Sequence, residues 1–291
     1  MKTIINNLKG ELYKFVSKRM KFNIMVKDKV ETLNIILANN SSVIRFGDGE
    51  FDLIRGKDIP YQSYNSQLAK RLKEIIIRGN YDNTVICLPD VFKNIERYTD
   101  DSNNFFYKRF FIQNRSFLRK IEKENNWYGS TFISRPYIDL KDKSNSADYF
   151  KNLKKIWNDK DVLIVEGEYT RSGEGNDLFS NTKSVKRIIC PSKNSYAKVK
   201  EIEKAIIDNC EDRVVLLMLG PTAKVIVDDL NKIDNQLIDI GHIDSEYEWF
   251  KMGATKKVKL KDKHTAEFNY DKNIKLPKDE KFQKQICEKI Y

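Results

Sequence analysis

The sequence predicts an α/β protein with a doubly wound, mostly parallel sheet and helices on both faces. Three observations support this fold class. Apolar runs rich in β-branched residues alternate with segments of helical periodicity along the chain. The apolar runs are continuous, as in strands buried on both faces. No repeat, low-complexity block or proline- and glycine-rich linker divides the chain.

The expected elements follow one another in a regular order. The strands are predicted at Ser42–Phe46, Thr84–Leu88, Ser130–Ser134, Asp161–Glu166, Val185–Cys190, Arg213–Leu219 and Gln236–Ile240. The helices between them are predicted at Val26–Ala38, Gln67–Arg78, Asn104–Glu124, Ser146–Asn158, Ser195–Asn209 and Thr222–Lys232.

Polar residues and glycines gather where these strands end. Parallel sheets bind ligands beyond the carboxyl ends of their strands, so the pattern indicates an enzyme. The segments are Asp48–Glu50, Pro89–Asp90, Glu166–Glu168, Pro191–Asn194, Gly220–Thr222 and Gly241–Glu246.

Composition limits the class of protein further. The chain has 291 residues, 40% of them hydrophobic, which is enough for a full core and excludes general disorder. Its four cysteines form no CxxC pair, which favours a reducing, cytoplasmic location, including the inner face of the plasma membrane. We see no signal peptide and no apolar stretch of the roughly 20 residues that a spanning helix needs.

The net charge of +11 indicates an anionic partner and concentrates toward the two ends. Residues 1–24 are expected to form a basic amphipathic helix, which could lie on an anionic membrane or pack on the domain or on a second subunit. From residue 251 to 291 there are 12 lysines against 6 acidic residues. We expect residues 269–291 to form a basic, solvated tail. Peripheral membrane contact through these ends and self-association both stay open.

The segment Asp48-Gly49-Glu50 is the strongest candidate for chemistry. In an extended segment, residues two apart point the same way, so both carboxylates could hold Mn²⁺ or Mg²⁺. Such an ion would stabilise the charge on a departing diphosphate. The alternative is an ordinary solvated turn. Arg45, just before the motif, could reach a phosphate or hold Asp48.

Further candidates follow the later strands. Gly173 and Gly175 are spaced as in a phosphate-binding loop, although the complete GxGxxG and P-loop patterns are absent and a plain surface loop is the alternative. Pro221 and Thr222 open a helix whose free N–H groups could bind an anion, or could simply shape a tight turn. Ser192 and Asn194 could face a ribose or base, while the alternative is that Asn194 and Ser195 simply cap the next helix.

The last strand is followed by His242 and three acidic residues, Asp244, Glu246 and Glu248. A histidine in this position could bind metal or phosphate, or orient another group, while a purely structural role is the alternative. One of the carboxylates could act as the base that removes a proton from an acceptor hydroxyl. The spacing does not decide which one.

Taken together, several segments resemble one known family. They are Arg45–Phe51, Ile86–Phe92, Gly173–Phe179, Ser184–Asn194, Leu219–Ala223 and Asp239–Trp249. In this order they are similar to the GT-D type glycosyltransferases, formerly a domain of unknown function (DUF1792), over about residues 25–268.

The resemblance implies a Rossmann-like fold and an inverting transfer of a hexose from a UDP-sugar, with UDP-glucose and UDP-galactose as the first expected donors. It implies a glycan acceptor on a lipid carrier or glycoprotein, in bacterial surface polysaccharide or adhesin glycosylation. By the same resemblance Asp48 and Glu50 hold Mn²⁺ or Mg²⁺, and His242, Asp244, Glu246 and Glu248 form the reacting edge. The implied donor-binding residues are Arg45, Gly175, Asn176, Asp177, Ser192, Asn194, Pro221 and Thr222.

Two rival functions deserve a test. A nucleotide-sugar or phosphoester hydrolase could use the same ion on water, and it would release free sugar instead of transferring it. A nucleic-acid-binding protein would use the basic surface. The latter is disfavoured because the lysines lack interleaved arginines and aromatic residues, so we expect no nucleic-acid partner.

Overall fold

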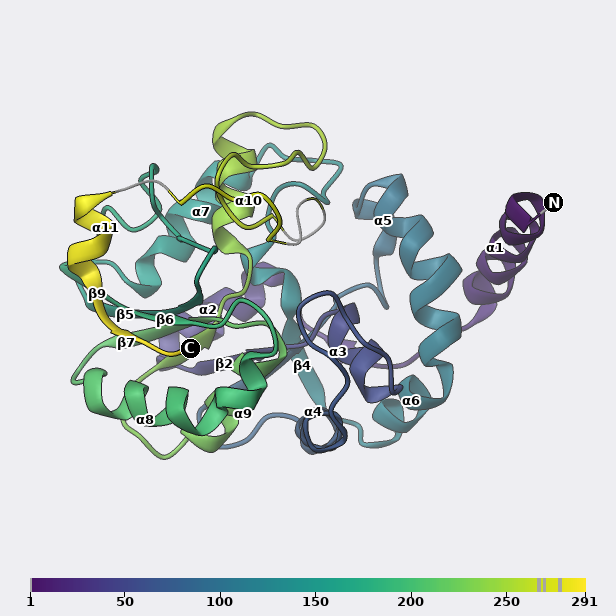
Figure 1. Ribbon diagram of the computed structural model, residues 1–291. Helices are drawn as coiled ribbons and strands as arrows, with labels where there is room; N and C mark the ends of the chain where they lie inside the picture. Colours follow the sequence, from purple (N-terminus) through teal and green to yellow (C-terminus); the bar gives the residue numbers. More distant parts are fainter. Residues whose placement is uncertain (1, 266–267, 269–270, 277–278) are drawn as a thin grey trace.

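The structure, a computed structural model, describes residues 2–265, 268, 271–276 and 279–291. In these residues nine parallel strands form one open sheet (Figure 1). Across the sheet they lie in the order β1 (Met25–Val26), β4 (Trp127–Ser130), β3 (Thr84–Leu88), β2 (Ser42–Arg45), β8 (Leu237–Asp239), β7 (Val214–Met218), β5 (Asp161–Gly167), β6 (Ser184–Cys190) and β9 (Ile286–Lys289). The predicted fold class is confirmed.

Helices cover both faces of the sheet and enclose two apolar cores. Neighbouring residues of β2 show the division, because Val43 packs into one core and Ile44 into the other. Figure 1 shows α7 and α10 on one side of the sheet and α8 and α9 on the other. One core includes α2 (Lys29–Asn39), α7 (Ser146–Leu153) and α10 (Ile243–Lys251), and the other includes α3 (Asp48–Ile54), α4 (Ser66–Arg78), α6 (Phe111–Lys123), α8 (Val199–Asn209) and α9 (Pro221–Asp229).

A helical arm lies at the β1–β4 end of the molecule. Helix α5 (Asp100–Phe105) runs through a five-residue π-helix, η2 (Phe106–Phe110), into α6, where the sequence predicted one uninterrupted helix. The terminal helix α1 (Lys2–Arg19) packs on η2 and α6 (Figure 1). The expected helix at the start of the chain is therefore present.

The start of α2 differs from the prediction for a clear reason. The predicted helix began at Val26, but Met25 and Val26 pair with β4 instead. The Asp28 side chain caps α2 by accepting hydrogen bonds from the N–H groups of Val30 (2.8 Å) and Glu31 (2.9 Å). In turn, the Glu31 carboxylate accepts a hydrogen bond from the Asp28 N–H (3.0 Å). This capping box fixes the first turn after the short strand.

The predicted strand Ser130–Ser134 is wrong in position. Strand β4 ends at Ser130, and residues 131–134 form a short 3-10 helix. The Ser130 hydroxyl accepts the N–H of Phe132 at 3.1 Å, while the Thr131 carbonyl accepts a bond from the Arg45 guanidinium at 3.0 Å. The backbone groups that a strand would use for pairing are therefore taken by side chains.

The C-terminal residues also differ from the expected solvated tail. Residue 269, where that tail was placed to begin, lies outside the described residues, but α11 (Glu280–Gln285) and β9 are ordered parts of the fold. Strand β9 pairs with β6 and so covers an otherwise open edge. Phe282 of α11 is buried beneath the guanidinium groups of Arg171 and Arg187, at 4.2 and 4.5 Å from its ring centroid.

We expect Gly129→Ala to destabilise the protein. A Cβ at Gly129 in β4 would stand 2.7 Å from Cys87 Sγ, 2.7 Å from Thr32 Cγ2 and 2.9 Å from Val85 Cγ1. Overpacking of this kind costs about 1–3 kcal/mol. Urea unfolding measures the loss.

Gly10→Ala is the matched control. Gly10 lies within helix α1, and a Cβ there would contact Lys108 Cδ at an ordinary distance of 3.5 Å. Alanine is favoured over glycine in helices by about 1 kcal/mol, so this variant should be as stable as the parent or more so. Equal stability of Gly129→Ala and the parent would contradict the close packing of β4.

Candidate functional site

The candidate site is built on Arg45 and Asp239 at the carboxyl ends of β2 and β8. The Arg45 backbone N–H donates to Asp239 Oδ2 (3.0 Å), and its Nε donates to the Asp239 carbonyl (2.7 Å). Its Nη1 donates to Thr131 O and, at 2.5 Å, to Ser134 Oγ. Arg45 is 7% exposed, so its guanidinium joins β2, β8 and the end of β4. It holds Asp239, whereas the sequence suggested Asp48 or a phosphate.

Gly241 allows this arrangement. It adopts a φ of +54°, and a Cβ there would stand 2.0 Å from Arg45 Nη2. Any side chain at Gly241 would therefore strain the backbone and displace the guanidinium.

Lys224 completes a buried cluster of four charges. Its Nζ lies 2.9 Å from Asp239 Oδ2 and 3.2 Å from Glu50 Oε1, and it donates to the Gly220 carbonyl at 3.0 Å. Lys224, Glu50 and Asp239 are all under 8% exposed. Together with Arg45 they give two positive and two negative charges, so the cluster is neutral and each ion has an opposite partner.

The Asp48-Gly49-Glu50 motif begins helix α3 and does not form the extended turn that the sequence suggested. Glu50 Oε2 accepts the Gly47 N–H at 2.8 Å, which satisfies a free donor at the helix start. Its other oxygen faces Lys224. The carboxyl group of Glu50 is thus fixed from both sides by residues of its own site.

The Asp48 side chain is exposed to solvent. Even so, loss of hydration beside the surrounding protein raises the pKa of Asp48 above its usual range. The neighbouring Glu50 carboxylate is the second cause, and Arg135 opposes the shift. A second positive charge near the pair would therefore favour ionised Asp48.

His242 lies at the start of α10, beyond the end of β8. Its ring stacks on that of His264, with centroids 5.2 Å apart and 18° between the planes, and the Tyr61 ring lies 6.5 Å away. Loss of hydration within the surrounding protein lowers the pKa of His242 well below its ordinary value. The positive charges of His264 and Arg135 add to the effect. The imidazole is therefore neutral at pH 7, with one nitrogen free to accept a hydrogen bond or bind a metal.

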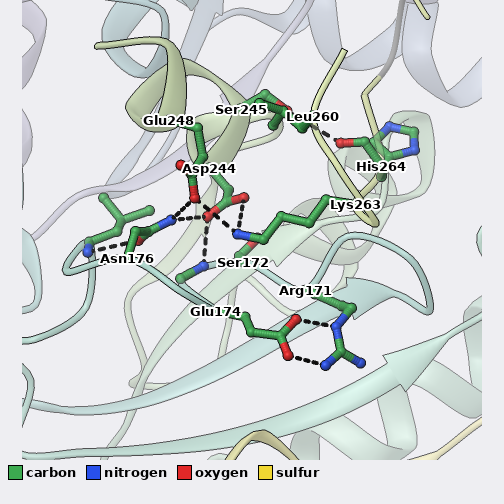
Figure 2. A network of polar contacts seen from close by, with 12 residues as sticks. Arg171, Ser172, Glu174, Asn176, Asp244, Ser245, Glu248, Leu260, Lys263 and His264 are labelled. Atoms are coloured by element: carbon green, nitrogen blue, oxygen red, sulfur yellow. Dashed lines mark hydrogen bonds and ion pairs between the residues drawn. The ribbon is translucent and has the colours of Figure 1, made fainter. Parts of the chain in front are cut away.

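Asp244 and Glu248 hold a loop and a lysine in place, as Figure 2 shows. Asp244 accepts the Gly173 N–H (2.7 Å) and the Asn176 amide (2.9 Å), and it pairs with Lys263 (3.0 Å). The Asn176 amide and Lys263 also contact Glu248 Oε1, at 2.6 and 3.2 Å. Burial raises the pKa of Asp244. The network fixes the glycine-rich loop after β5 against α10.

Glu246 faces the opposite direction. Its Oε1 accepts the backbone N–H groups of Tyr137 (2.8 Å) and Ile138 (2.9 Å), and it is 1% exposed. Burial raises its pKa. Glu246 therefore anchors the loop after β4 to α10 and does not open to a substrate.

The predicted donor-binding residues differ in how far they are exposed. Pro221 and Thr222 are buried in the first turn of α9, where the Thr222 hydroxyl meets that of Ser195 at 3.0 Å. Asn194 is exposed in a left-handed conformation, and its Oδ1 accepts the Ser63 N–H at 2.7 Å. Ser192 is half-buried beside Gly167.

The glycine-rich loop opens onto a cavity of about 700 Å³ lined by Glu174, Gly175, residues 261–263 and residues 279–281. Gly175 therefore borders an open space that a ligand could enter. Asp177 is exposed and pairs with Lys251 at 3.2 Å and with Lys154 at 3.7 Å. Its carboxylate is directed to these surface lysines.

Sequence reasoning missed the roles of Lys224, Asp239, Arg135 and His264. Lys224 and Asp239 lie within predicted elements, but nothing in a helix or strand pattern marks a charged residue as buried. The two charges pair directly, with Lys224 Nζ 2.9 Å from Asp239 Oδ2, and Asp239 also accepts the backbone N–H of Arg45, 194 residues away in the sequence. A charged residue on the last position of an apolar strand was the one available signal.

The site residues fit a divalent cation bound jointly with a substrate. Among the described residues, no three His, Cys, Asp or Glu side chains gather closely enough to hold a metal ion by themselves. Mg²⁺ commonly takes one or two carboxylates and completes its shell with phosphate and water. Asp48 is exposed, yet loss of hydration beside the surrounding protein and, second, the Glu50 carboxylate raise its pKa, a shift that a bound cation would oppose. Glu50 would contribute from its fixed position.

Comparison with known proteins gives a consistent result. The sequence pattern of the family described as "Glycosyltransferase GT-D fold" matches residues 43–268. The chain is 51% identical over 260 residues to "Probable glycosyl transferase Gly" of Streptococcus gordonii and 45% identical over 285 residues to "Glycosyltransferase GlyD" of Streptococcus pneumoniae serotype 4. These matches cover 89% and 97% of this chain but 38% and 35% of the relatives, so the chain spans little more than a third of their length.

Solved structures match over their full length. One, described as "A New Glycosyltransferase (DUF1792) from Streptococcus sanguinis", has a TM-score of 0.90 and 48% identity over 92% of this chain. Another, described as "The highly conserved domain of unknown function 1792 has a distinct glycosyltransferase fold", has a TM-score of 0.86 and 49% identity over 97% of this chain. In both comparisons the match covers 100% of the solved chain.

Lys224→Met should be strongly destabilising. The change leaves Glu50 and Asp239 buried with one cation fewer, and breaking a buried ion pair costs about 3–5 kcal/mol. Urea unfolding measures the effect. Lys232→Met is the control, because its ion pair with Asp82 is exposed and worth at most about 1 kcal/mol. Equal effects of the two changes would contradict the cluster.

The protonation of His242 should depend on folding. In the folded protein its imidazole stays neutral well below pH 6.5, whereas in the unfolded chain it titrates near 6.5. The unfolded state thus binds the extra proton, so His242 makes stability fall as the pH drops from about 6.5 toward the folded pKa, and has no effect above that window.

NMR titration of the imidazole C–H signals checks this expectation. The chain has only two histidines, so His264→Gln assigns both signals. The same titration in urea is the control. A folded-state midpoint for His242 at or above 6.5 would overturn the assignment of a neutral ring.

Proposed function

This chain belongs to the glycosyltransferases that have the GT-D fold, and we propose that it transfers a hexose from a UDP-sugar to a glycan acceptor with a divalent cation. The observation that supports this proposal best is the environment of Asp48. It is an exposed carboxylate beside a second, fixed carboxylate at the start of a helix, where the carboxyl ends of the central strands meet.

Asp48 and Glu50 would hold Mn²⁺ or Mg²⁺. When bound, such an ion supplies positive charge to the leaving UDP. Lys224 keeps Glu50 in one orientation, and Arg45 keeps Asp239 and the β4 loop in register beneath it. Neutral His242, at the start of α10, can orient a donor or acceptor group through its free nitrogen.

We assign the proton-accepting role to Glu248 among the three acidic residues of α10. An inverting transfer needs one carboxylate to take the proton of the acceptor hydroxyl. Asp244 and Glu246 are buried and engaged by backbone N–H groups, so they serve to position loops. Glu248 is half-buried and uses only Oε1 in its contacts with Asn176 and Lys263.

The donor loop would run from Gly175 to Asp177, beside the cavity of about 700 Å³. Asn194, exposed and left-handed, and Ser192 would contact the donor from the loop that follows β6. UDP-glucose and UDP-galactose are the first donors to test. We propose an acceptor glycan on a lipid carrier or glycoprotein in the cytoplasm, in bacterial surface polysaccharide or adhesin glycosylation.

Asp48→Asn should strongly reduce transfer without unfolding the protein. The side chain is exposed, so the melting temperature of the variant should stay within a few degrees of that of the parent protein. Its kcat/KM should fall about 10²–10³-fold, as when one group that stabilises a transition state is removed. Radiolabelled UDP-sugars with a glycan acceptor, with Mn²⁺ or with chelator, measure the activity.

Three controls make the test specific. Glu50→Gln should also lose activity but should lower stability as well, because Lys224 then faces a neutral amide. Glu248→Gln should lower kcat while UDP still raises the melting temperature in the presence of Mn²⁺. Release of free sugar without transfer would favour the hydrolase. Full transfer by Asp48→Asn, or transfer untouched by chelator, would contradict the proposal.

A further inference from the structure

Helix α1 directs three large apolar side chains away from the protein. Leu8, Leu12 and Phe15 lie one above another on a single helix face and are 66%, 58% and 57% exposed. Three large apolar side chains in a row are uncommon on a free surface and indicate a contact surface. Figure 1 shows α1 at one end of the molecule, beyond α6.

The inner face of α1 is polar, which reverses the usual arrangement. Lys14 Nζ donates to Asn104 Oδ1 at 2.9 Å, Glu11 pairs with Lys108 at 2.5 Å, and Ser17 is 1% exposed. A surface helix normally buries its apolar stripe against its own domain. Because α1 is attached to the domain by polar contacts, its apolar stripe is available to something outside the domain.

The charges beside the stripe distinguish between occupants. Lys9, Lys18 and Arg19 are exposed, and the Arg19 guanidinium lies 3.4 Å from the centroid of the Phe15 ring. The acidic residue of this part of the helix, Glu11, is already neutralised by Lys108. A second copy of α1 would bring the same cations against these, whereas an anionic surface would complement them.

We propose that the outer face of α1 docks on an anionic phospholipid bilayer. Leu8, Leu12 and Phe15 enter the boundary between headgroups and acyl chains, and the flanking cations contact lipid phosphates. The helix lies in the plane of the surface. In the described part of the chain, no helix has both the length and the apolar character to cross a membrane. This docking is independent of the transfer reaction and of the proposed metal.

Vesicle sedimentation of the full chain tests the docking. Vesicles of phosphatidylglycerol and phosphatidylcholine should bind the protein, while vesicles of phosphatidylcholine alone should bind it at least 10-fold more weakly. The double change Leu12→Glu and Phe15→Glu should weaken binding to the anionic vesicles at least 10-fold. High salt should weaken it as well, because the cationic contribution is screened.

Ile207→Glu is the matched control. Ile207 is 53% exposed on α8, away from α1, so the same charge change there should leave vesicle binding unaltered. Circular dichroism verifies that each variant is folded. Equal binding to both vesicle types, or unchanged binding by the double variant, would overturn the proposal. So would a parent protein that is a dimer, ignores vesicles and becomes a monomer on the double change, since the occupant would then be a second copy.

Discussion

The neutral cluster of Arg45, Glu50, Lys224 and Asp239 is the constraint on which the site depends. Each member comes from a different element, namely β2, α3, α9 and β8, and each is almost fully buried. Charges in such a place are stable only when every one has a partner at close range. The positions of strands β2 and β8 and of helices α3 and α9 are therefore fixed by one set of contacts.

Above this cluster, similar residue types take different roles because their surroundings differ. Glu50 is held by the Gly47 N–H and Lys224, whereas Asp48 is exposed beside it. Along α10, Asp244 and Glu246 are tied to backbone N–H groups of two separate loops, and Glu248 is half-buried. Environment, more than residue identity, separates the positioning carboxylates from those available to a substrate.

The sequence predicted the sheet well because its strands are continuous apolar runs, a pattern that does not depend on distant partners. It failed where tertiary contacts decide. Asp48-Gly49-Glu50 has the composition of a turn, yet it starts a helix because Glu50 caps the Gly47 N–H. Strand β9, Ile-Cys-Glu-Lys, looks like part of a lysine-rich tail and becomes a strand only against the free edge of β6. The spacing of its two carboxylates identified the motif as a candidate metal site, and the family resemblance added the UDP-sugar donor.

The strand order has a consequence for synthesis on the ribosome. Strand β8 joins β2 to β7, so the groups β1–β4 and β5–β7 remain separate until about residue 239 has been translated. Until then β2 and β7 each present an unpaired, apolar edge, which is a template for aggregation. Late closure of the middle of the sheet leaves the edge of β2 unpaired in the nascent chain until β8 has been made, and long-range strand pairing of this kind is slow.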